Sequence, residues 1–176
     1  MKNFNNLPKI IFCDRLILLP FTTEICEEIL NKNFDKIEKI GLKKGKNWPD
    51  FEMLDTLPKI IQNLSKVASP SGFESWMIIK KTTNEIIGDI GFKGFDEQNN
   101  CCDIGYGIIE AERRNGYAEE ASKHLINWVL NVNSSINITA STLNGNTASI
   151  NLLHKLNFIA IKKDENYIYW KLQNVN

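Results

Sequence analysis

The sequence predicts a single domain of the mixed α/β class, in which one sheet is flanked by helices. Two observations lead to this prediction. Apolar, strand-like runs alternate with segments whose apolar residues recur every three or four positions, as they do on one face of a helix. The chain has 176 residues, of which 43% are hydrophobic and 24% charged, and these are ordinary values for one domain with a sizeable core.

The N-terminal part of the chain predicts one strand and two helices. The strand is expected at residues 15–19, and the first helix follows it with Thr22 or Thr23 as its cap. Residues 41–50 are rich in glycine and lysine and predict a loop. A second helix is expected over residues 58–67, where apolar residues form a stripe.

The remaining part predicts six strands and two helices, and residues 96–100 form a turn between two of the strands. The strands are expected at 76–79, 86–92, 103–109, 137–142, 158–161 and 167–172, and the helices at 117–131 and 148–156. The resulting order of elements fits a mixed sheet flanked by helices.

The turn between strand 103–109 and the next helix is the most informative segment. Backbone N–H groups of such a turn aim at one point, and the helix dipole adds partial positive charge there. Gly116 lets the chain approach an anion with no side chain in the way, and two arginines add charge nearby. The segment therefore predicts a phosphate site, although an ordinary strand-to-helix connection would look the same. The candidate residues are Arg113, Arg114, Asn115, Gly116, Tyr117 and Ala118.

This turn resembles the pyrophosphate-binding signature of the GNAT acetyltransferase superfamily, Arg/Gln-x-x-Gly-x-Gly/Ala. Arg113, Gly116 and Ala118 fill its defined positions. Segment 146–158 resembles the Asn-x-x-Ser helix and following Lys-Leu-Gly-Phe of ribosomal-protein N-terminal acetyltransferases, with an asparagine in place of the glycine. Three further segments match in the family's order, namely 15–18, 87–92 and 103–106.

The resemblance covers about residues 14–172 and implies one GNAT domain over residues 1–176. The implied fold is a mostly antiparallel, twisted sheet of about seven strands with about four helices. The implied activity is transfer of the acetyl group of acetyl-CoA to a primary amine, which belongs either to a protein N-terminus or to a small molecule. The implied CoA contacts are the 113–118 turn together with Ile108, Ile109, Asn146 and Ser149.

The residue pattern of strand 103–109 predicts local structure independently of the resemblance. Asp103, Gly105 and Gly107 share one face by the period-two rule, and the two glycines leave a groove on that face. The pair Ile108-Ile109 then breaks the alternation, which predicts a bulge with free backbone groups. One of these two N–H groups could stabilise the oxyanion of the reaction.

Two side chains are candidates for the chemistry. Asp103 occupies the position where many GNAT members carry a glutamate base, although it is equally a strand-edge aspartate that faces solvent or caps a turn. Many members carry a tyrosine acid at the position of Leu153, and leucine cannot donate a proton. Ser149 is then the nearest hydrogen-bond donor for the sulfur, while its alternative role is a contact at the helix N-terminus.

Composition limits the other possibilities. The formal net charge is zero, with 21 basic and 21 acidic side chains, so no global field recruits nucleic acid. No run approaches the length of a membrane span, and none of the four cysteines lies in a Cys-x-x-Cys pair, so neither a membrane nor a metal is expected as a partner. Residues 1–6 lack the apolar core of a signal peptide, and we expect a cytoplasmic protein. A monomer and a homodimer both remain open.

Two other classes of function compete with an enzyme. A non-catalytic module that binds acetyl-CoA or CoA would explain Leu153 and the short Asp103 side chain. A nucleotide-binding domain could use the same anion turn, but the sequence lacks both Gly-x-x-x-x-Gly-Lys-Ser/Thr and Gly-x-Gly-x-x-Gly, so this class ranks last.

Overall fold

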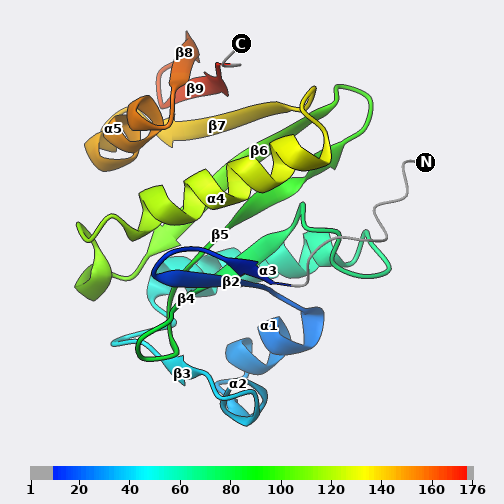
Figure 1. Ribbon diagram of the computed structural model, residues 1–176, viewed down its shortest axis with the longest axis vertical. Coiled ribbons are helices and arrows are strands. Elements are labelled where there is room, and N and C mark those ends of the chain that lie inside the picture. The colour runs from blue at the N-terminus through cyan, green and yellow to red at the C-terminus, as the bar shows by residue number, and fades with distance from the viewer. Residues whose placement is uncertain (1–9, 174–176) are drawn as a thin grey trace.

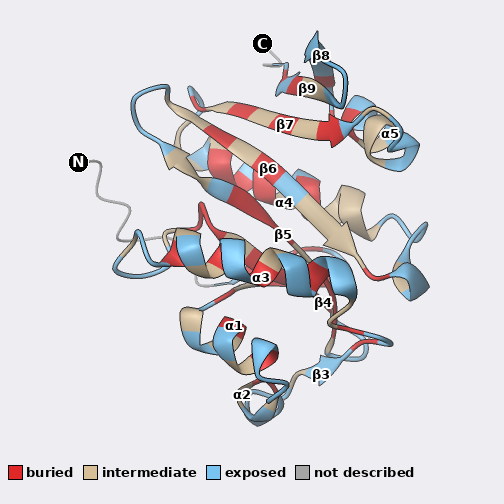
Figure 2. Cartoon of the chain, turned by 180° about the vertical axis from the view of Figure 1, so that it is seen from behind, coloured by how far each residue is buried: buried red, intermediate tan, exposed pale blue. Residues whose placement is uncertain are grey.

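The computed structural model describes residues 10–173, and the strands within this span form one nine-stranded sheet with helices on both faces (Figures 1 and 2). The strands are β1 (Ile11–Phe12), β2 (Leu16–Pro20), β3 (Lys43–Lys44), β4 (Ser75–Lys80), β5 (Glu85–Asp96), β6 (Cys101–Ile108), β7 (Asn137–Leu143), β8 (Phe158–Lys163) and β9 (Tyr167–Leu172). The helices are α1 (Thr23–Leu30), α2 (Asp35–Lys39), α3 (Phe51–Leu64), α4 (Tyr117–Val132) and α5 (Thr147–Lys155), and a 3₁₀ turn covers Glu110–Glu112.

The sheet is mostly antiparallel, as expected. Its order is β1-β2-β4-β5-β6-β7-β9-β8, and β3 pairs beside this path with β5. Only the β6–β7 and β3–β5 pairs are parallel among the described strands. The mixed α/β fold class predicted from the sequence is therefore confirmed.

Helices cover both faces of the central strands. In Figure 1 α4 lies in front of β5 and β6, and in Figure 2, seen from behind, α3 lies next to β5 with α1 beside it. This explains why β4 is buried along four consecutive residues instead of alternating between buried and exposed. It also explains the long buried run at the start of β5.

The structure corrects the expected helix at 58–67. Helix α3 begins at Phe51, seven residues earlier, because the Asp50 carboxylate caps it and accepts a hydrogen bond of 2.9 Å from the Met53 N–H. Pro58 lies inside the helix instead of in its first turn, where proline is favoured. This correction brings Asp50 and Glu52 to the face of α3 that overlooks β5 and β6.

Several short elements were not predicted from the sequence. The loop expected at 41–50 contains β3, and β1 and α2 are additional, so the described sheet has nine strands where about seven were expected, and the described helices number five where about four were expected. Elements of two to five residues carry too little periodicity to be recognised. The expectation about residues 1–6 lies outside the described residues.

The bulge expected at Ile108-Ile109 is wrong. The β5–β6 register runs without interruption from Phe92 opposite Ile104 to Gly88 opposite Ile108, and the irregularity lies instead in β5, between Phe92 and Phe95. The alternation breaks at this pair because β6 ends at Ile108 and the 3₁₀ turn begins at Glu110. No helix of the described chain is long and apolar enough to cross a bilayer.

Candidate active site

Strand β6 has a backbone edge that is not covered by its neighbour. The parallel β6–β7 register ends at Ile104 opposite Ala140, whereas β6 continues to Ile108. Residues in an antiparallel pair point their N–H and C=O groups alternately toward and away from the partner strand. Because the Ile109 N–H donates to the Ile87 carbonyl, the alternation directs the backbone groups of Ile108 away from β5. We call residues 105–108 the free edge of β6.

Of the two backbone donors predicted for this strand, only one is available. The Ile109 N–H is occupied by its 3.0 Å hydrogen bond to Ile87, and the Ile109 side chain is buried. The Ile108 N–H points into the gap between β6 and β7, while its carbonyl accepts a 2.8 Å hydrogen bond from Nε of Arg113. The oxyanion donor expected from the sequence is thus narrowed to Ile108.

The glycine turn after β6 has the geometry expected of an anion site. Gly116 has a φ of 79° and stands at the N-terminus of α4, where it offers no side chain as a cap. The first helical hydrogen bond runs from Glu120 to the Gly116 carbonyl. The N–H groups of Tyr117, Ala118 and Glu119 therefore have no carbonyl inside the helix to accept them, and they are available to a phosphate.

Carboxylates next to this turn are neutralised by neighbouring cations. Arg15 forms a 2.7 Å ion pair with Glu120 and lies 4.7 Å above the centre of the Tyr117 ring. Glu119 pairs with Lys123 at 2.8 Å, which lowers the pKa of this carboxyl. The charge of these two glutamates is thereby offset, so an anion can approach the helix end.

The three residues before Gly116 have different surroundings. The Arg113 guanidinium turns back to the Ile108 carbonyl and to Glu52, which lies 3.3 Å away, so it links the end of β6 to α3. The Asn115 side chain donates to the Glu112 carbonyl at 3.1 Å. Arg114 has a φ of 64°, and it is exposed, as Arg113 is.

Helix α5 begins at the far side of the gap between β6 and β7. The Asn146 side chain caps it and accepts a 3.1 Å hydrogen bond from the Ser149 N–H. Leu153 is buried and contributes only packing. Ser149 is partly exposed in the first turn, where its hydroxyl remains available.

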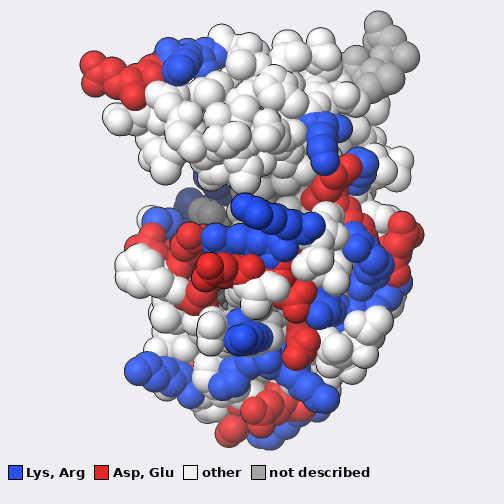
Figure 3. Space-filling model, turned by 90° about the vertical axis from the view of Figure 1, so that its left-hand side faces the viewer, with Lys and Arg blue, Asp and Glu red and all other residues white. Residues whose placement is uncertain are grey.

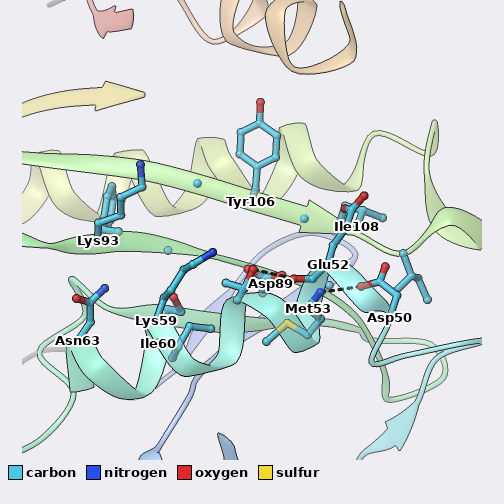
Figure 4. Close-up of a pocket in the computed structure, with 18 of the residues that line it drawn as sticks. Asp50, Glu52, Met53, Lys59, Ile60, Asn63, Asp89, Lys93, Tyr106 and Ile108 are labelled. Atoms are coloured by element: carbon cyan, nitrogen blue, oxygen red, sulfur yellow. Dashed lines mark hydrogen bonds between the residues drawn. The ribbon is translucent and has the colours of Figure 1, made fainter. Parts of the chain in front are cut away.

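Tyr106 provides a second hydroxyl in this gap. Its side chain points away from α3 and toward α5 (Figure 4). The hydroxyl is buried without an aligned hydrogen-bond partner in the described chain, although Ser149 lies close enough to influence it. Burial raises the pKa of Tyr106, and the nearby Ser149 hydroxyl offsets part of this increase. The sequence analysis did not identify this pair, because it depends on a contact between distant elements.

A cleft lies on the opposite face of β6, between this strand and α3. Its volume is about 460 Å³. A Cβ atom on Gly105 would meet nothing within 4 Å, so the groove predicted from the glycines is confirmed. Side chains of Asp50, which caps α3, and of Glu52, Lys59 and other α3 residues form the opposite wall (Figure 4). The free edge of β6 therefore lies between a cleft on one face and the Tyr106 hydroxyl on the other.

Asp103, the base candidate from the sequence, is held by two partners. Its Oδ1 lies 2.5 Å from the Lys93 ammonium, and its Oδ2 accepts a 3.1 Å hydrogen bond from the Thr139 hydroxyl. It stands opposite Thr139, where β7 is still paired with β6. The structure thus places Asp103 before the beginning of the free edge, with both carboxylate oxygens engaged.

Asp89 is a carboxylate that the sequence analysis missed. It lies in the middle of β5, opposite Gly107, and reaches the floor of the cleft. Burial raises its pKa to about 7, and the charges of Asp50 and Glu52 add to the increase. Its only sequence signal is an acidic residue inside an otherwise apolar and glycine-rich strand.

The charge distribution of the surface is local and mixed. Figure 3 shows Lys and Arg intermingled with Asp and Glu over one part of the face, while the rest of that face carries few charges. Within residues 10–173, no group of three or more His, Cys, Asp or Glu side chains has an arrangement that could hold a metal ion. The anion site predicted at Gly116 would therefore be a local feature.

Comparison with known families gives a match over most of the chain. The model of the acetyltransferase (GNAT) domain matches residues 15–159. The chain belongs to the GNAT acetyltransferase family. A curated relative, the uncharacterized N-acetyltransferase YjdG of Bacillus subtilis (strain 168), is 32% identical over 157 residues, which are 89% of this chain and 94% of the relative.

Solved structures agree with this fold. The ribosomal-protein-S5-alanine acetyltransferase of Vibrio fischeri superposes with a TM-score of 0.65 at 14% identity, over 94% of this chain and 96% of that protein. The microcin C7 self-immunity acetyltransferase MccE, solved with acetyl-CoA and AMP, gives a TM-score of 0.62 at 18% identity, over 92% and 93% of the two chains. At these identities the likeness concerns the fold alone.

Proposed function

We propose that this protein is an N-acetyltransferase that moves the acetyl group of acetyl-CoA to a primary amine. The observation that carries the proposal is the free edge of β6, which joins the Gly116 turn at one end to the cleft under α3 on one face. An extended ligand can lie along unpaired backbone groups as an additional strand would. Acetyl-CoA has a pyrophosphate for the turn and a long amide-containing arm for such an edge.

The phosphate end of this site would be formed by the turn. The N–H groups of Tyr117 and Ala118 would bind the pyrophosphate, and Gly116 would keep the approach open. Arg114 would add surface charge. Arg113 would act through its hydrogen bond to the Ile108 carbonyl, which holds the end of the free edge in place.

The reacting thioester would lie beside the free edge. Attack by a neutral amine nitrogen forms a C–N bond and places negative charge on the thioester oxygen. The Ile108 N–H, which faces the gap, is positioned to stabilise this charge. The cleft under α3 gives the amine access from one face, so the acceptor and the CoA arm would approach the same carbonyl from different directions.

Collapse of the intermediate breaks the C–S bond on the other face. The thiolate then needs a proton, and it accepts one readily at neutral pH because the thiol that it forms has a pKa of about 8.5. The Tyr106 and Ser149 hydroxyls lie together in the gap and can supply or relay that proton. They would take the role that Leu153 cannot fill. Asn146 would support Ser149 through the helix cap.

The acceptor class follows from the charges in the cleft. The three carboxylates Asp50, Glu52 and Asp89 outnumber the two ammonium groups of Lys59 and Lys93 in its lining, and this excess favours a group that arrives as an ammonium ion. A protein N-terminus and a small-molecule amine both satisfy this requirement. The proposal of Asp103 as proton acceptor stays open to test, as do the cytoplasmic location and the choice between a monomer and a homodimer.

The experiment is a transfer assay with pooled amines. Purified protein is incubated with acetyl-CoA and either short peptides with free N-termini or mixed small primary amines, and release of the CoA thiol is followed. Amine-dependent release with formation of acetylated amine supports the proposal. Saturable binding of acetyl-CoA with no release in either pool supports the alternative, a non-catalytic module that binds acetyl-CoA.

A further inference from the structure

Asp89 occupies a special position relative to the free edge. It stands directly opposite Gly107, in the middle of residues 105–108. A Cβ atom built on Gly107 would lie 3.1 Å from Oδ1 of Asp89, so the carboxylate leans across β6 into the space that a side chain at position 107 would fill. The absence of a side chain at Gly107 therefore leaves room for this carboxylate on the cleft face of β6.

The carboxylate of Asp89 has no partner of its own. In the described part of the chain its oxygens make neither a hydrogen bond nor an ion pair, and they face the cleft while protein surrounds them elsewhere. The charged side chains around it are Asp50, Glu52 and Lys59 on the α3 side and Lys93 on its own strand. Asp89 is half-buried, and a carboxylate that is partly removed from water without a partner is unfavourable. A bound cation would relieve this cost.

We propose that Asp89 binds the acceptor ammonium in the cleft and removes its proton, and so acts as the catalytic base of the acetyl transfer. This inference rests on the proposed function. It assigns the proton acceptor to β5 instead of to Asp103 on β6.

The step balances in protons and electrons. The ammonium N–H bond breaks, its proton moves to the Asp89 carboxylate, and the freed electron pair of the nitrogen forms the new C–N bond. The C–S bond then breaks and the thiolate keeps its electron pair, while one of the two protons left on nitrogen passes through the Tyr106 side of the site to sulfur and the other stays on the amide. Asp89 finally loses its proton to solvent, so one proton is released for each acetyl group transferred.

Distance separates the two carboxylates as candidates. Asp103 lies four residues before Gly107, which is about 13 Å along a strand. Both oxygens of Asp103 are already engaged by Lys93 and Thr139. Asp89 lies opposite Gly107, and its carboxylate is free. A base near pH 7 is also well matched to proton transfer at neutral pH, and burial places the pKa of Asp89 at about 7.

The test compares three variants with the amine that the wild type turns over fastest. For Asp89→Asn we expect kcat/KM to fall by about 10²-fold or more, with acetyl-CoA affinity unchanged within about twofold. In the wild type kcat/KM should rise with pH near pH 7, and this rising limb of the pH profile should disappear in the variant. Asp89→Glu, which keeps a carboxylate, should restore part of the rate. Glu97→Gln removes an exposed carboxylate in the β5–β6 turn and should match the wild type.

The outcomes separate the inference from the proposed function. Wild-type turnover that persists in Asp89→Asn with the same pH limb would overturn Asp89 as base and leave the acetyl transfer intact. Loss of the limb in Asp103→Asn alone would assign the base to Asp103 instead. Absence of turnover in the wild type with every amine would overturn the proposed function itself. If Asp89 has only a structural role, Asp89→Asn should lower the folded fraction but keep the rise of kcat/KM near pH 7.

Discussion

Removal of the Asp89 carboxylate should stabilise the folded protein at alkaline pH. In the unfolded chain this group titrates near its ordinary value of 3.8, and in the folded protein burial raises its pKa to about 7. Between these two values the unfolded chain has already lost a proton that the folded protein retains. The free energy of unfolding therefore decreases as the pH rises through this window, and the contribution is lost once the pH exceeds about 7.

The size of this effect follows from the shift. A difference of about three pKa units corresponds to about 4 kcal/mol in total, at about 1.4 kcal/mol per unit. Roughly 1.5 kcal/mol of this loss occurs below pH 5, so about 2.5 kcal/mol remains between pH 5 and pH 8. Asn at position 89 does not titrate. The stability of Asp89→Asn minus that of the wild type should thus increase by about 2.5 kcal/mol over this interval.

Urea unfolding at pH 5 and pH 8 measures this difference without any substrate. All other titrating groups are shared by the two proteins, so their contributions cancel in the double difference. Glu97→Gln is the matched control, because the removed carboxylate is exposed, and its double difference should stay near zero. An equally flat result for Asp89→Asn would show that Asp89 titrates as an ordinary surface carboxyl, and the argument for a buried base would fail.

Three further substitutions test other parts of the site. Gly116→Val should weaken acetyl-CoA binding by about tenfold or more while the protein still folds. A branched residue at a φ of 79° is strained, and its Cβ would enter the phosphate approach, 3.4 Å from Arg15. Calorimetric titration measures the affinity, and an unchanged affinity would place the phosphates elsewhere. Gly105→Val should fold normally, since a Cβ there meets nothing within 4 Å. It should raise KM for the amine several-fold with little change in KM for acetyl-CoA. An unaltered amine KM would exclude this wall of the cleft as part of the amine site. Tyr106→Phe should lower kcat by about tenfold, mostly below pH 8.5 where the thiolate needs a proton, and a kcat equal to wild type would remove this hydroxyl from the reaction.

The parts of the fold that could be predicted from the sequence are those with strong local signals. The strands around the glycines and the helix after Gly116 were recognised because hydrophobic spacing and turn chemistry agree there. Helix α3 shows the opposite case. The residue Pro58 suggested a start, whereas the actual cap at Asp50 stands directly after a Trp-Pro pair that suggested a loop. A proline inside a helix is tolerated when tertiary packing compensates for the lost hydrogen bond, and packing cannot be read from local sequence.

The candidate site likewise has parts that local sequence predicts and parts that depend on contacts between distant segments. The strand-to-helix turn at Gly116 depends on residues close in sequence, and its position before α4 was predicted correctly. Asp89 depends on the β5–β6 register and on α3, which begins nearly forty residues earlier, so its role could not be read from spacing. Asp103 was selected by family position, and the sequence could not reveal that Lys93 reaches the same carboxylate across the sheet.

Stabilisation by acetyl-CoA is the most direct test of the account as a whole. A ligand that binds only the folded protein adds about 2.7 kcal/mol at a hundredfold excess over Kd. For a chain of this size that corresponds to an increase in Tm of roughly 5–10 °C. We predict this increase for acetyl-CoA with the wild type, a much smaller one with Gly116→Val at the same concentration, and none with NAD. An unchanged Tm at saturating acetyl-CoA, or an equal increase in Gly116→Val, would contradict the central claim that the free edge of β6 and the Gly116 turn bind acetyl-CoA.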